Sequence, residues 1–304
     1  MSKKTLLIVG ASSALGKAVS ARAREYGQWR IVETYSANPL RRGVKLDLTV
    51  DEPHEVLDFV DDKTTTLIFS AVADPATVFD DPIRAARINV TGASSLIDFL
   101  IRKGSRIVFA SSVEALDGSF APQDERSDPN PLNLYGRMKT EVENYLRSQA
   151  EPGNYSIIRT PWICHLDLAS RCVVKQAYRA MLSAKLPAFA NDYLTGIVFA
   201  GDVAEGYSRL VADEELPPVL HFAADSHFSR LDLAKYIISE SVLGAEMNFS
   251  ETTFGQLNLD EPRARDTRLS NSLSKDRYGI TYRPALELIA QKVRILDSAD
   301  ATIS

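Results

Sequence analysis

The chain has 304 residues, 45% of them hydrophobic and 25% charged, and a formal net charge of −5. This length suits one large α/β domain with an added lobe. The negative charge gives no attraction to nucleic acid or acidic membranes, so neither is expected as a partner. Two cysteines are too few for a disulfide scaffold, and the four histidines show no metal-ligand spacing, so no metal is expected. The start lacks the pattern of a signal peptide, and we expect a cytoplasmic protein.

The amino terminus predicts a strand, a glycine turn and a helix, in that order. Thr5 to Val9 is apolar, Gly10 to Gly16 reads Gly-Ala-Ser-Ser-Ala-Leu-Gly, and Lys17 to Tyr26 is typical of a helix that ends at Gly27. Amides at such a helix start can bind a pyrophosphate. We therefore expect a dinucleotide to be held by Gly10, Ser12, Ser13, Ala14, Leu15 and Gly16. An ordinary βα turn without a ligand is the alternative.

Strands and helices alternate through the next part of the chain. Further strands are predicted at Trp29–Thr34, Val44–Leu48, from Leu67, at Arg106–Ala110 and at Ser156–Arg159, and helices at Asp51–Val60, Pro82–Arg102 and Pro131–Ala150. This alternation predicts a Rossmann-type, doubly wound parallel sheet with helices on both faces. Ligands of such sheets bind at the carboxyl ends of the strands. Gly10, Ala71, Ser112 and Pro161 follow strand ends, so they should ring one crevice.

The end of the second strand bears on the choice of cofactor. NAD-binding folds place an acidic residue there, but Glu33 comes too early and should lie inside the strand. Ser36, Arg41 and Arg42 follow it and could accommodate a 2′-phosphate, which favours NADP(H) over NAD(H). Both arginines could instead be ordinary solvated charges of a loop. Asp47 and Leu48, after the third strand, fit a contact with the adenine.

Tyr135 and Lys139 stand four residues apart, so a helix would place them on one face. A nearby ammonium favours the phenolate and lowers the pKa of a tyrosine. The pair is therefore a candidate acid/base unit for chemistry at a carbonyl. The alternative is a packed tyrosine beside a solvated lysine.

The alternation weakens after Pro161. Helices are predicted at Leu166–Ser183 and from Ser229 to about Leu243, and a strand at Val219–Ala223. A further helix is predicted to begin at Asp202, with Glu205 completing a capping box. No linker separates the halves, so we expect the carboxyl-terminal half to interleave with the first domain. The expected division is residues 1–165 and 195–225 for the dinucleotide-binding domain, 166–194 and 226–296 for a smaller substrate-binding lobe, and 297–304 for a frayed polar tail.

Several motifs together resemble the extended short-chain dehydrogenases/reductases of the NAD-dependent epimerase/dehydratase superfamily, and within them the dTDP-4-dehydrorhamnose reductases. The resemblance runs nearly end to end. Its segments are GASSALG from Gly10, LDLT from Leu46, SAVA from Ser70, NVTGA from Asn89, Ser111-Ser112, PLNLYGRMK from Pro131, RTPW from Arg159, GDVAE from Gly201 and RARDTRLS from Arg263.

The resemblance implies roles for individual residues. Tyr135 would protonate a carbonyl oxygen as hydride reaches its carbon, Lys139 would lower the tyrosine pKa and bind the nicotinamide ribose, and Ser112 would bind the substrate oxygen. Further cofactor contacts are implied for Ala71, Val72, Ala73, Asn89 and Pro161, and further substrate contacts for Val113, Glu114, Trp162 and Arg263. A homodimer formed by the helices at Pro82–Arg102 and Pro131–Ala150 is also implied.

Departures from the family pattern bear on the substrate. Val113 stands where related dehydratases carry their acid, so dehydration is disfavoured. The diphosphate of a nucleotide-sugar calls for arginine, for which Arg263, Arg265 and Arg268 are candidates. Cys164 and His165 are expected in a core or loop role, without a nucleophilic function.

Three functions remain open. We expect an NAD(P)H-dependent reductase of a nucleotide-linked keto-sugar of the 4-keto-6-deoxy type. A sugar-nucleotide epimerase with tightly bound NAD is the second possibility. A non-catalytic regulatory subunit similar to that of methionine adenosyltransferase, which shares the PLNLYG segment, is the third.

Overall fold

A seven-stranded parallel sheet forms the centre of the larger lobe. The computed structural model describes residues 3–170, 172–183 and 185–300. In the sheet the strand order is β10-β6-β5-β4-β1-β2-β3, and every pairing is parallel. The strands are β1 (Thr5–Val9), β2 (Arg30–Tyr35), β3 (Val44–Lys45), β4 (Thr64–Ile68), β5 (Arg106–Ala110), β6 (Tyr155–Arg159) and β10 (Val219–His221). The predicted Rossmann-type fold is confirmed.

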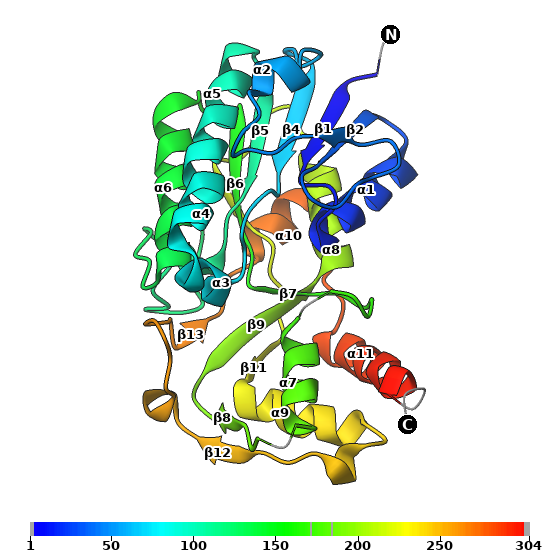
Figure 1. Cartoon of the computed structure of the whole chain (residues 1–304), viewed down its shortest axis with the longest axis vertical. Coiled ribbons are helices and arrows are strands. Elements are labelled where there is room, and N and C mark those ends of the chain that lie inside the picture. The colour runs from blue at the N-terminus through cyan, green and yellow to red at the C-terminus, as the bar shows by residue number, and fades with distance from the viewer. Residues whose placement is uncertain (1–2, 171, 184, 301–304) are drawn as a thin grey trace.

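Helices cover both faces of this sheet (Figure 1). Leu6 and Ile8 of β1 pack into a core with α1 (Ala14–Tyr26) and α8 (Ala200–Leu210). Leu7 and Val9 pack on the opposite face with α5 (Ala93–Arg102) and α6 (Leu134–Gln149). Because successive side chains of a strand point to opposite faces, a strand buried on both sides is continuously apolar. The short α2 (Pro53–Val56), which lies against α5, replaces the longer helix predicted at Asp51–Val60.

The long helix predicted at Pro82–Arg102 is divided into three segments. These are α4 (Pro82–Ala86), the π-helix η1 (Arg87–Gly92) and α5, and they follow α3 (Pro75–Asp80). At Gly92 an added Cβ would lie 2.4 Å from the Leu48 carbonyl oxygen, so only glycine allows this close approach. The wider turn also holds the buried Asn89, whose amide binds the backbone of Val72. Such π-turns occur often at functional sites.

The smaller lobe is built around a second sheet. Its strands are β7 (Trp162–Cys164), β9 (Leu194–Phe199), β11 (His227–Ser229) and β13 (Asp266–Thr267), and a separate pair is formed by β8 (Ala188–Ala190) and β12 (Ser250–Thr252). Its helices are α7 (Val173–Met181), α9 (Arg230–Glu240) and α11 (Ala285–Asp300), with short 3₁₀ turns η3 (Gly244–Glu246) and η4 (Phe254–Gln256). Figure 1 shows this lobe below the larger sheet. A further 3₁₀ turn, η2 (Val113–Ala115), follows β5 of the large sheet and packs against α6. The predicted helix at Leu166–Ser183 is reduced to α7.

The chain crosses between the lobes more than once. Strand β9 belongs to the small sheet, and the following α8 and β10 return to the large one. The expected return over residues 195–225 therefore begins only after Phe199. Helix α10 (Ser272–Tyr278) also packs against α8 and β10, although it was assigned to the substrate lobe.

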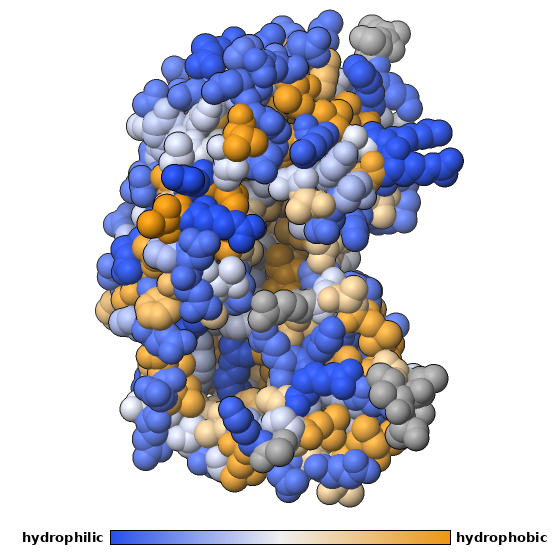
Figure 2. Space-filling view, viewed as in Figure 1, coloured by the Kyte–Doolittle hydropathy of each residue, from blue (hydrophilic) through white to orange (hydrophobic). Residues whose placement is uncertain are grey.

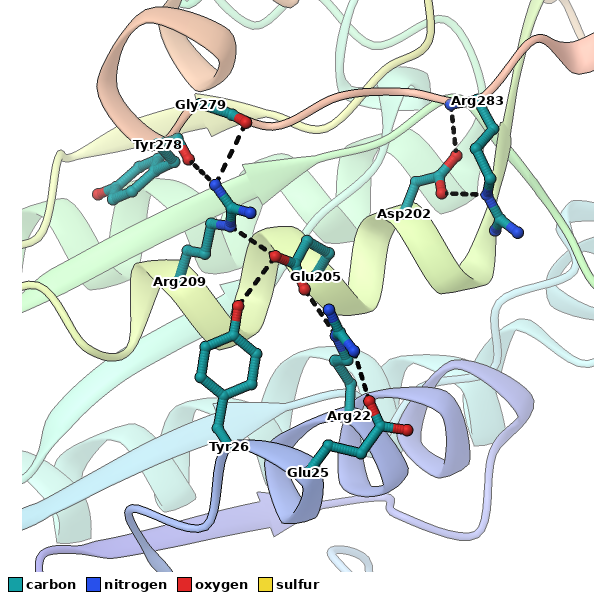
Figure 3. A network of polar contacts seen from close by, with 9 residues as sticks. All are labelled: Arg22, Glu25, Tyr26, Asp202, Glu205, Arg209, Tyr278, Gly279 and Arg283. Atoms are coloured by element: carbon teal, nitrogen blue, oxygen red, sulfur yellow. Dashed lines mark hydrogen bonds and ion pairs between the residues drawn. The ribbon is translucent and has the colours of Figure 1, made fainter.

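The capping box predicted at Asp202 and Glu205 is wrong. Helix α8 begins at Ala200 without a side-chain cap. Asp202 accepts a hydrogen bond from Arg283 Nε at 2.6 Å, and Glu205 accepts from Arg22 Nε at 2.6 Å (Figure 3). These two carboxylates join separate parts of the chain instead. The cap predicted at Ser229 is present, with Asp232 completing its box, and α9 ends at Glu240.

The tail predicted to fray from Asp297 is ordered up to Asp300. Helix α11 continues to that residue, and the Asp297 carboxylate accepts hydrogen bonds from the hydroxyls of Tyr178 at 2.8 Å and Ser241 at 2.6 Å. Residues 301–304 of the predicted tail lie outside the described residues. Within the part of the chain that is described, no helix is long and apolar enough to span a membrane.

Candidate active site

A cavity of about 430 Å³ lies at the carboxyl ends of β1, β4, β5 and β6, with walls from both lobes. Figure 2 shows the molecule hollowed between the two lobes, with hydrophobic side chains at the floor. The sequence-predicted residues in its wall are Ser13, Leu15, Ala71, Ala73, Ser112, Val113, Glu114, Tyr135, Lys139, Pro161 and Trp162. The predicted crevice at the strand ends is thus present.

Other predicted residues lie outside the cavity wall. Gly10, Ser12, Ala14 and Gly16 shape the turn beside it, and Val72 and Asn89 lie behind Ala71 and Ala73. Ser36, Arg41, Arg42, Asp47 and Leu48 belong to the segment after β2, and Arg263 lies beside Glu114. Their roles in binding stay predictions.

The turn after β1 has the geometry of a dinucleotide cradle. Gly10 has a φ of 82°, and an added Cβ there would lie 2.7 Å from the Ser70 amide nitrogen. An added Cβ at Gly16 would lie 2.6 Å from the Gly10 carbonyl oxygen. Ser13 replaces the usual middle glycine and caps α1, accepting a hydrogen bond from the Gly16 amide at 3.0 Å. The amides of Ala14 and Leu15, in the first turn of α1, have no intrahelical acceptor and fit a pyrophosphate.

Helix α6 places Tyr135 and Lys139 in the cavity wall. The helix begins after Asn133, whose side chain accepts a hydrogen bond from the Gly136 amide at 2.8 Å. Both side chains are buried, and the Lys139 ammonium lies 5.8 Å from the centroid of the Tyr135 ring. Ser112, after β5, lines the same cavity, and the interaction of its hydroxyl with the Tyr135 phenol opposes the rise of the Tyr135 pKa. The three residues expected to act together therefore face one cavity.

The electrostatics of the pair differ from the expectation. Burial and the nearby Glu114 carboxylate raise the pKa of Tyr135, so Lys139 does not make it a phenolate here. Burial lowers the pKa of Lys139 to about 8, and its ammonium donates to the Ala110 carbonyl at 2.7 Å. The ammonium is thus directed at the backbone, and desolvation dominates both groups. A neutral phenol at neutral pH is suited to donating a proton to a carbonyl oxygen.

A buried ion pair lies next to Ser111 and Lys139, close to the cavity wall. Arg159 donates to both carboxylate oxygens of Glu143, at 3.1 and 2.8 Å, and neither side chain is exposed. Ser111, next to Ser112, donates to Glu143 at 2.5 Å. Glu143 also follows Lys139 by one helical turn, and its charge raises the Lys139 pKa against the effect of burial. The Glu143 carboxylate thus connects helix α6, which carries Lys139, with Arg159 at the end of β6 and with Ser111 after β5.

Some wall residues were not predicted from the sequence. They are Phe69, Asp74, Pro75, Ala110, Ser111, Thr160, Ile163, His165, Cys172, Gln176 and Tyr207. The position of Asp74, directly after Ala73, was a usable signal. The residues of α7 carried no local signal, because only the packing of the smaller lobe brings them to the cavity. Within the described residues, no cluster of three or more His, Cys, Asp or Glu could hold a metal ion.

Cys164, His165 and Cys172 differ in their access to the cavity. His165 and Cys172 form part of its wall, whereas Cys164 is fully buried. A hydrogen bond from the Cys164 thiol lowers the pKa of Cys172 to about 6, although burial opposes this shift. Burial lowers the pKa of His165. His165 is therefore neutral at physiological pH.

The segment after β2 leaves two arginines free for a ligand. Glu33 lies inside β2, as predicted, and pairs with Arg24 at 2.6 Å. Ser36, Arg41 and Arg42 are exposed, and in the described part of the chain neither guanidinium pairs with a carboxylate. This loop after β2 therefore exposes two positive charges.

The chain is similar to known proteins in sequence as well as in fold. The family described as the RmlD substrate binding domain matches residues 4–295. Methionine adenosyltransferase 2 subunit beta of Xenopus tropicalis is 29% identical over 157 residues, covering 51% of this chain and 46% of that protein. The chain thus matches about half the length of these curated relatives.

Solved structures share the fold over nearly the whole chain. The dTDP-4-dehydrorhamnose reductase of Bacillus anthracis in complex with NADP is 18% identical, with a TM-score of 0.75 over 97% of this chain and 99% of that one. UDP-glucose 4-epimerase of Thermotoga maritima, with UDP-glucose, is 18% identical, with a TM-score of 0.79 over 97% and 99%. At this identity the likeness establishes the fold alone.

Proposed function

We propose, from the premise that this chain belongs to the RmlD substrate binding domain family, that it is an NAD(P)H-dependent reductase of a nucleotide-linked keto-sugar. The observation that carries the proposal is the convergence of Ser112, Tyr135 and Lys139 on one cavity beside a glycine turn. A sugar of the 4-keto-6-deoxy type is the expected substrate.

The chain's own residues fit a reduction. The cradle at Gly10 and Gly16 would hold the pyrophosphate of the cofactor, because these glycines let β1 and α1 pack closely enough to present the first amides of α1. A bound reduced nicotinamide supplies the hydride. Ser112 would orient the carbonyl by hydrogen-bonding its oxygen, and Tyr135 would give that oxygen its proton. The ammonium of Lys139 would stabilise the phenolate that remains, so that C=O becomes CH–OH.

We propose NADPH as the preferred cofactor. The unpaired Arg41 and Arg42 support this preference, as does the engagement of Glu33 by Arg24 inside β2. An acidic residue free at the strand end would have favoured NAD instead.

The first test is a binding titration of the purified protein with NADPH and NADH. The wild type should bind NADPH more tightly, Arg42→Ala should weaken NADPH but not NADH, and Tyr135→Phe should bind NADPH nearly as well as wild type. Turnover of a panel of dTDP- and UDP-linked keto-sugars should be lost in Tyr135→Phe. If neither NADPH nor NADH binds at millimolar concentration, the proposal of an enzyme is refuted in favour of a partner-binding protein.

Two other functions have support of their own. The shared fold of a UDP-glucose 4-epimerase supports an epimerase, for which NAD should remain bound through purification. The sequence relatives named methionine adenosyltransferase 2 subunit beta support a regulatory subunit. Copurification with a methionine adenosyltransferase catalytic chain, with no turnover of any keto-sugar, would favour the subunit.

The homodimer through α5 and α6 is a further proposal, and sedimentation velocity measures it directly.

A further inference from the structure

Arg230 is held between two aromatic rings at the edge of the cavity. Its guanidinium carbon lies 4.4 Å from the centroid of the Trp162 ring and 4.9 Å from that of Tyr193. Trp162 is itself part of the cavity wall. Arg230 is the first residue of α9, directly after the cap Ser229, so the backbone that carries it is rigid. Rings that cover the faces of a guanidinium leave the N–H groups at its edge available.

No carboxylate neutralises Arg230 within ion-pair distance in the described part of the chain. Burial lowers the pKa of Arg230, and the neighbouring Tyr193 and Glu114 oppose this shift. The Arg230 guanidinium has therefore lost part of its hydration on burial without gaining a counterion. A ligand anion would supply the missing partner.

Arg263 adds a second positive charge near the same place. It lies 3.8 Å from Glu114, which is buried in the cavity wall and also accepts a hydrogen bond from Asn133 at 2.5 Å. The charges of both Arg263 and Glu114 act on Arg230. Two guanidinium groups thus face one carboxylate, which leaves a surplus of positive charge beside the cavity.

The other candidate arginines are less suited to this role. Arg268 forms a two-pronged contact with Asp266, its Nη2 lying 2.6 Å from Oδ2. The Arg265 side chain is 67% exposed and lies 3.9 Å from Asp192. Of the three arginines expected to bind a diphosphate, only Arg263 is close to the cavity wall, and Arg230 was not among them.

We propose that Arg230, fixed by Trp162 and Tyr193, binds the diphosphate of the nucleotide-linked substrate together with Arg263. The planar edge of a guanidinium matches two phosphate oxygens, and preorganisation by the rings limits the entropy lost on binding. This inference rests on the proposed function only for the identity of the sugar, because Arg230 and Arg263 would contact the phosphates of the substrate and not its sugar.

The test compares thymidine, dTMP and dTDP, and in parallel uridine, UMP and UDP, by isothermal titration calorimetry of the full chain. Wild type should bind a nucleoside diphosphate at least tenfold more tightly than the monophosphate. Arg230→Gln should remove most of that difference, and Arg230→Lys, which keeps the charge without the fork, should remove part of it. The matched control is Arg265→Gln, an exposed arginine of the same lobe, which should bind like wild type.

NADPH binding separates this inference from the proposed function. Each variant should bind NADPH as wild type does, which also shows that it is folded. Unchanged diphosphate binding in Arg230→Gln would overturn the inference, even if the wild type reduces a keto-sugar. Diphosphate binding that depends on Arg230, in a protein that reduces no keto-sugar, would support the site and refute the reductase.

Discussion

At the scale of single residues, the environment of the catalytic pair decides its protonation. Lys139 is buried, touches the Ala110 carbonyl and lies 4.6 Å from the centroid of the Phe109 ring. Burial lowers its pKa to about 8 and raises that of Tyr135. Across neutral and mildly alkaline pH the phenol therefore stays protonated, and the lysine is the group that changes charge.

The first prediction concerns pH. As the pH rises through about 8, Lys139 loses the proton that makes it an ammonium, so kcat/KM should fall above this value. The profile is measured with a keto-sugar substrate between pH 6 and 10. Lys139→Met should be nearly inactive, and the decline should be absent from its residual rate. A wild-type profile that stays level to pH 10 would contradict the assignment.

The second prediction concerns Glu143. Glu143→Gln leaves Arg159 buried without its anion, and a loss of about 3–5 kcal/mol of unfolding free energy is expected. It also removes the charge that raises the Lys139 pKa, so the alkaline decline should move to lower pH. Urea denaturation and the pH profile measure the two effects.

The control for Glu143 is Glu141→Gln on the same helix, where the side chain is exposed. It should leave both stability and the pH profile unchanged. A purely structural role of Glu143 would lower stability and leave the alkaline decline at its wild-type pH.

At the scale of elements, the glycine turn shows how one strand and one helix make a binding site. β1 and α1 approach so closely that a Cβ at Gly16 would meet the Gly10 carbonyl oxygen and the Ala11 Cα, at 2.6 and 2.7 Å. Both contacts are with backbone, which cannot move aside as a side chain can. The same closeness brings the first amides of α1 to the cavity.

The third prediction is that Gly16→Ala weakens NADPH binding at least tenfold, because α1 must shift away from the turn. Fluorescence titration of NADPH gives the dissociation constant, and thermal unfolding shows how much stability is lost. Gly255→Ala is the control, since nothing lies within 4 Å of a Cβ added there. Equal affinity in Gly16→Ala and wild type would mean that the turn does not bind the cofactor.

At the scale of the whole molecule, one acidic residue joins distant parts of the chain. Glu205 of α8 accepts hydrogen bonds from Arg22 and Tyr26 of α1 and from Arg209, at 2.6, 2.9 and 2.5 Å. Arg209 in turn donates to the carbonyl of Tyr278, at the end of α10, at 2.6 Å (Figure 3). Helices from the start, the middle and the last part of the chain are thus held together.

The fourth prediction is that Glu205→Gln lowers the unfolding free energy by about 1–2 kcal/mol, since the ion pairs of Glu205 with Arg22 and Arg209 are only partly exposed. Burial alone would raise the pKa of Glu205, but hydrogen bonds from Arg22, Arg209 and Tyr26 hold it below its usual value. The contribution of Glu205 to stability is therefore fully present above the pKa of an ordinary glutamate. It is lost as the pH falls through the lower pKa that Glu205 has in the folded protein.

Urea denaturation at pH 7 and at pH 3 measures this contribution of Glu205. The difference between wild type and Glu205→Gln should shrink at pH 3. Glu25→Gln, whose side chain is 62% exposed and pairs with Arg22, is the control and should cost little. A Glu205→Gln variant as stable as wild type at pH 7 would contradict the prediction.

The parallel sheet, the glycine turn and the placement of Tyr135 beside Lys139 could all be predicted from the sequence alone. Each of these depends on residues close together in the chain: apolar runs such as Leu6 to Val9, a glycine on each side of a turn, and the one-turn spacing of Tyr135 and Lys139. Local spacing sets which face a side chain takes, so these features need no knowledge of distant residues.

Only the tertiary structure decided the pKa values and the composition of the cavity wall. Whether Lys139 affects Tyr135 depends on burial and on the Ala110 carbonyl, and Arg230 meets Trp162 only because β7, β9 and α9 pack together. The partners of Asp202 and Glu205 likewise come from other parts of the chain, which is why a local capping rule failed there. Desolvation and long-range contacts depend on the whole fold, and no window of sequence contains them.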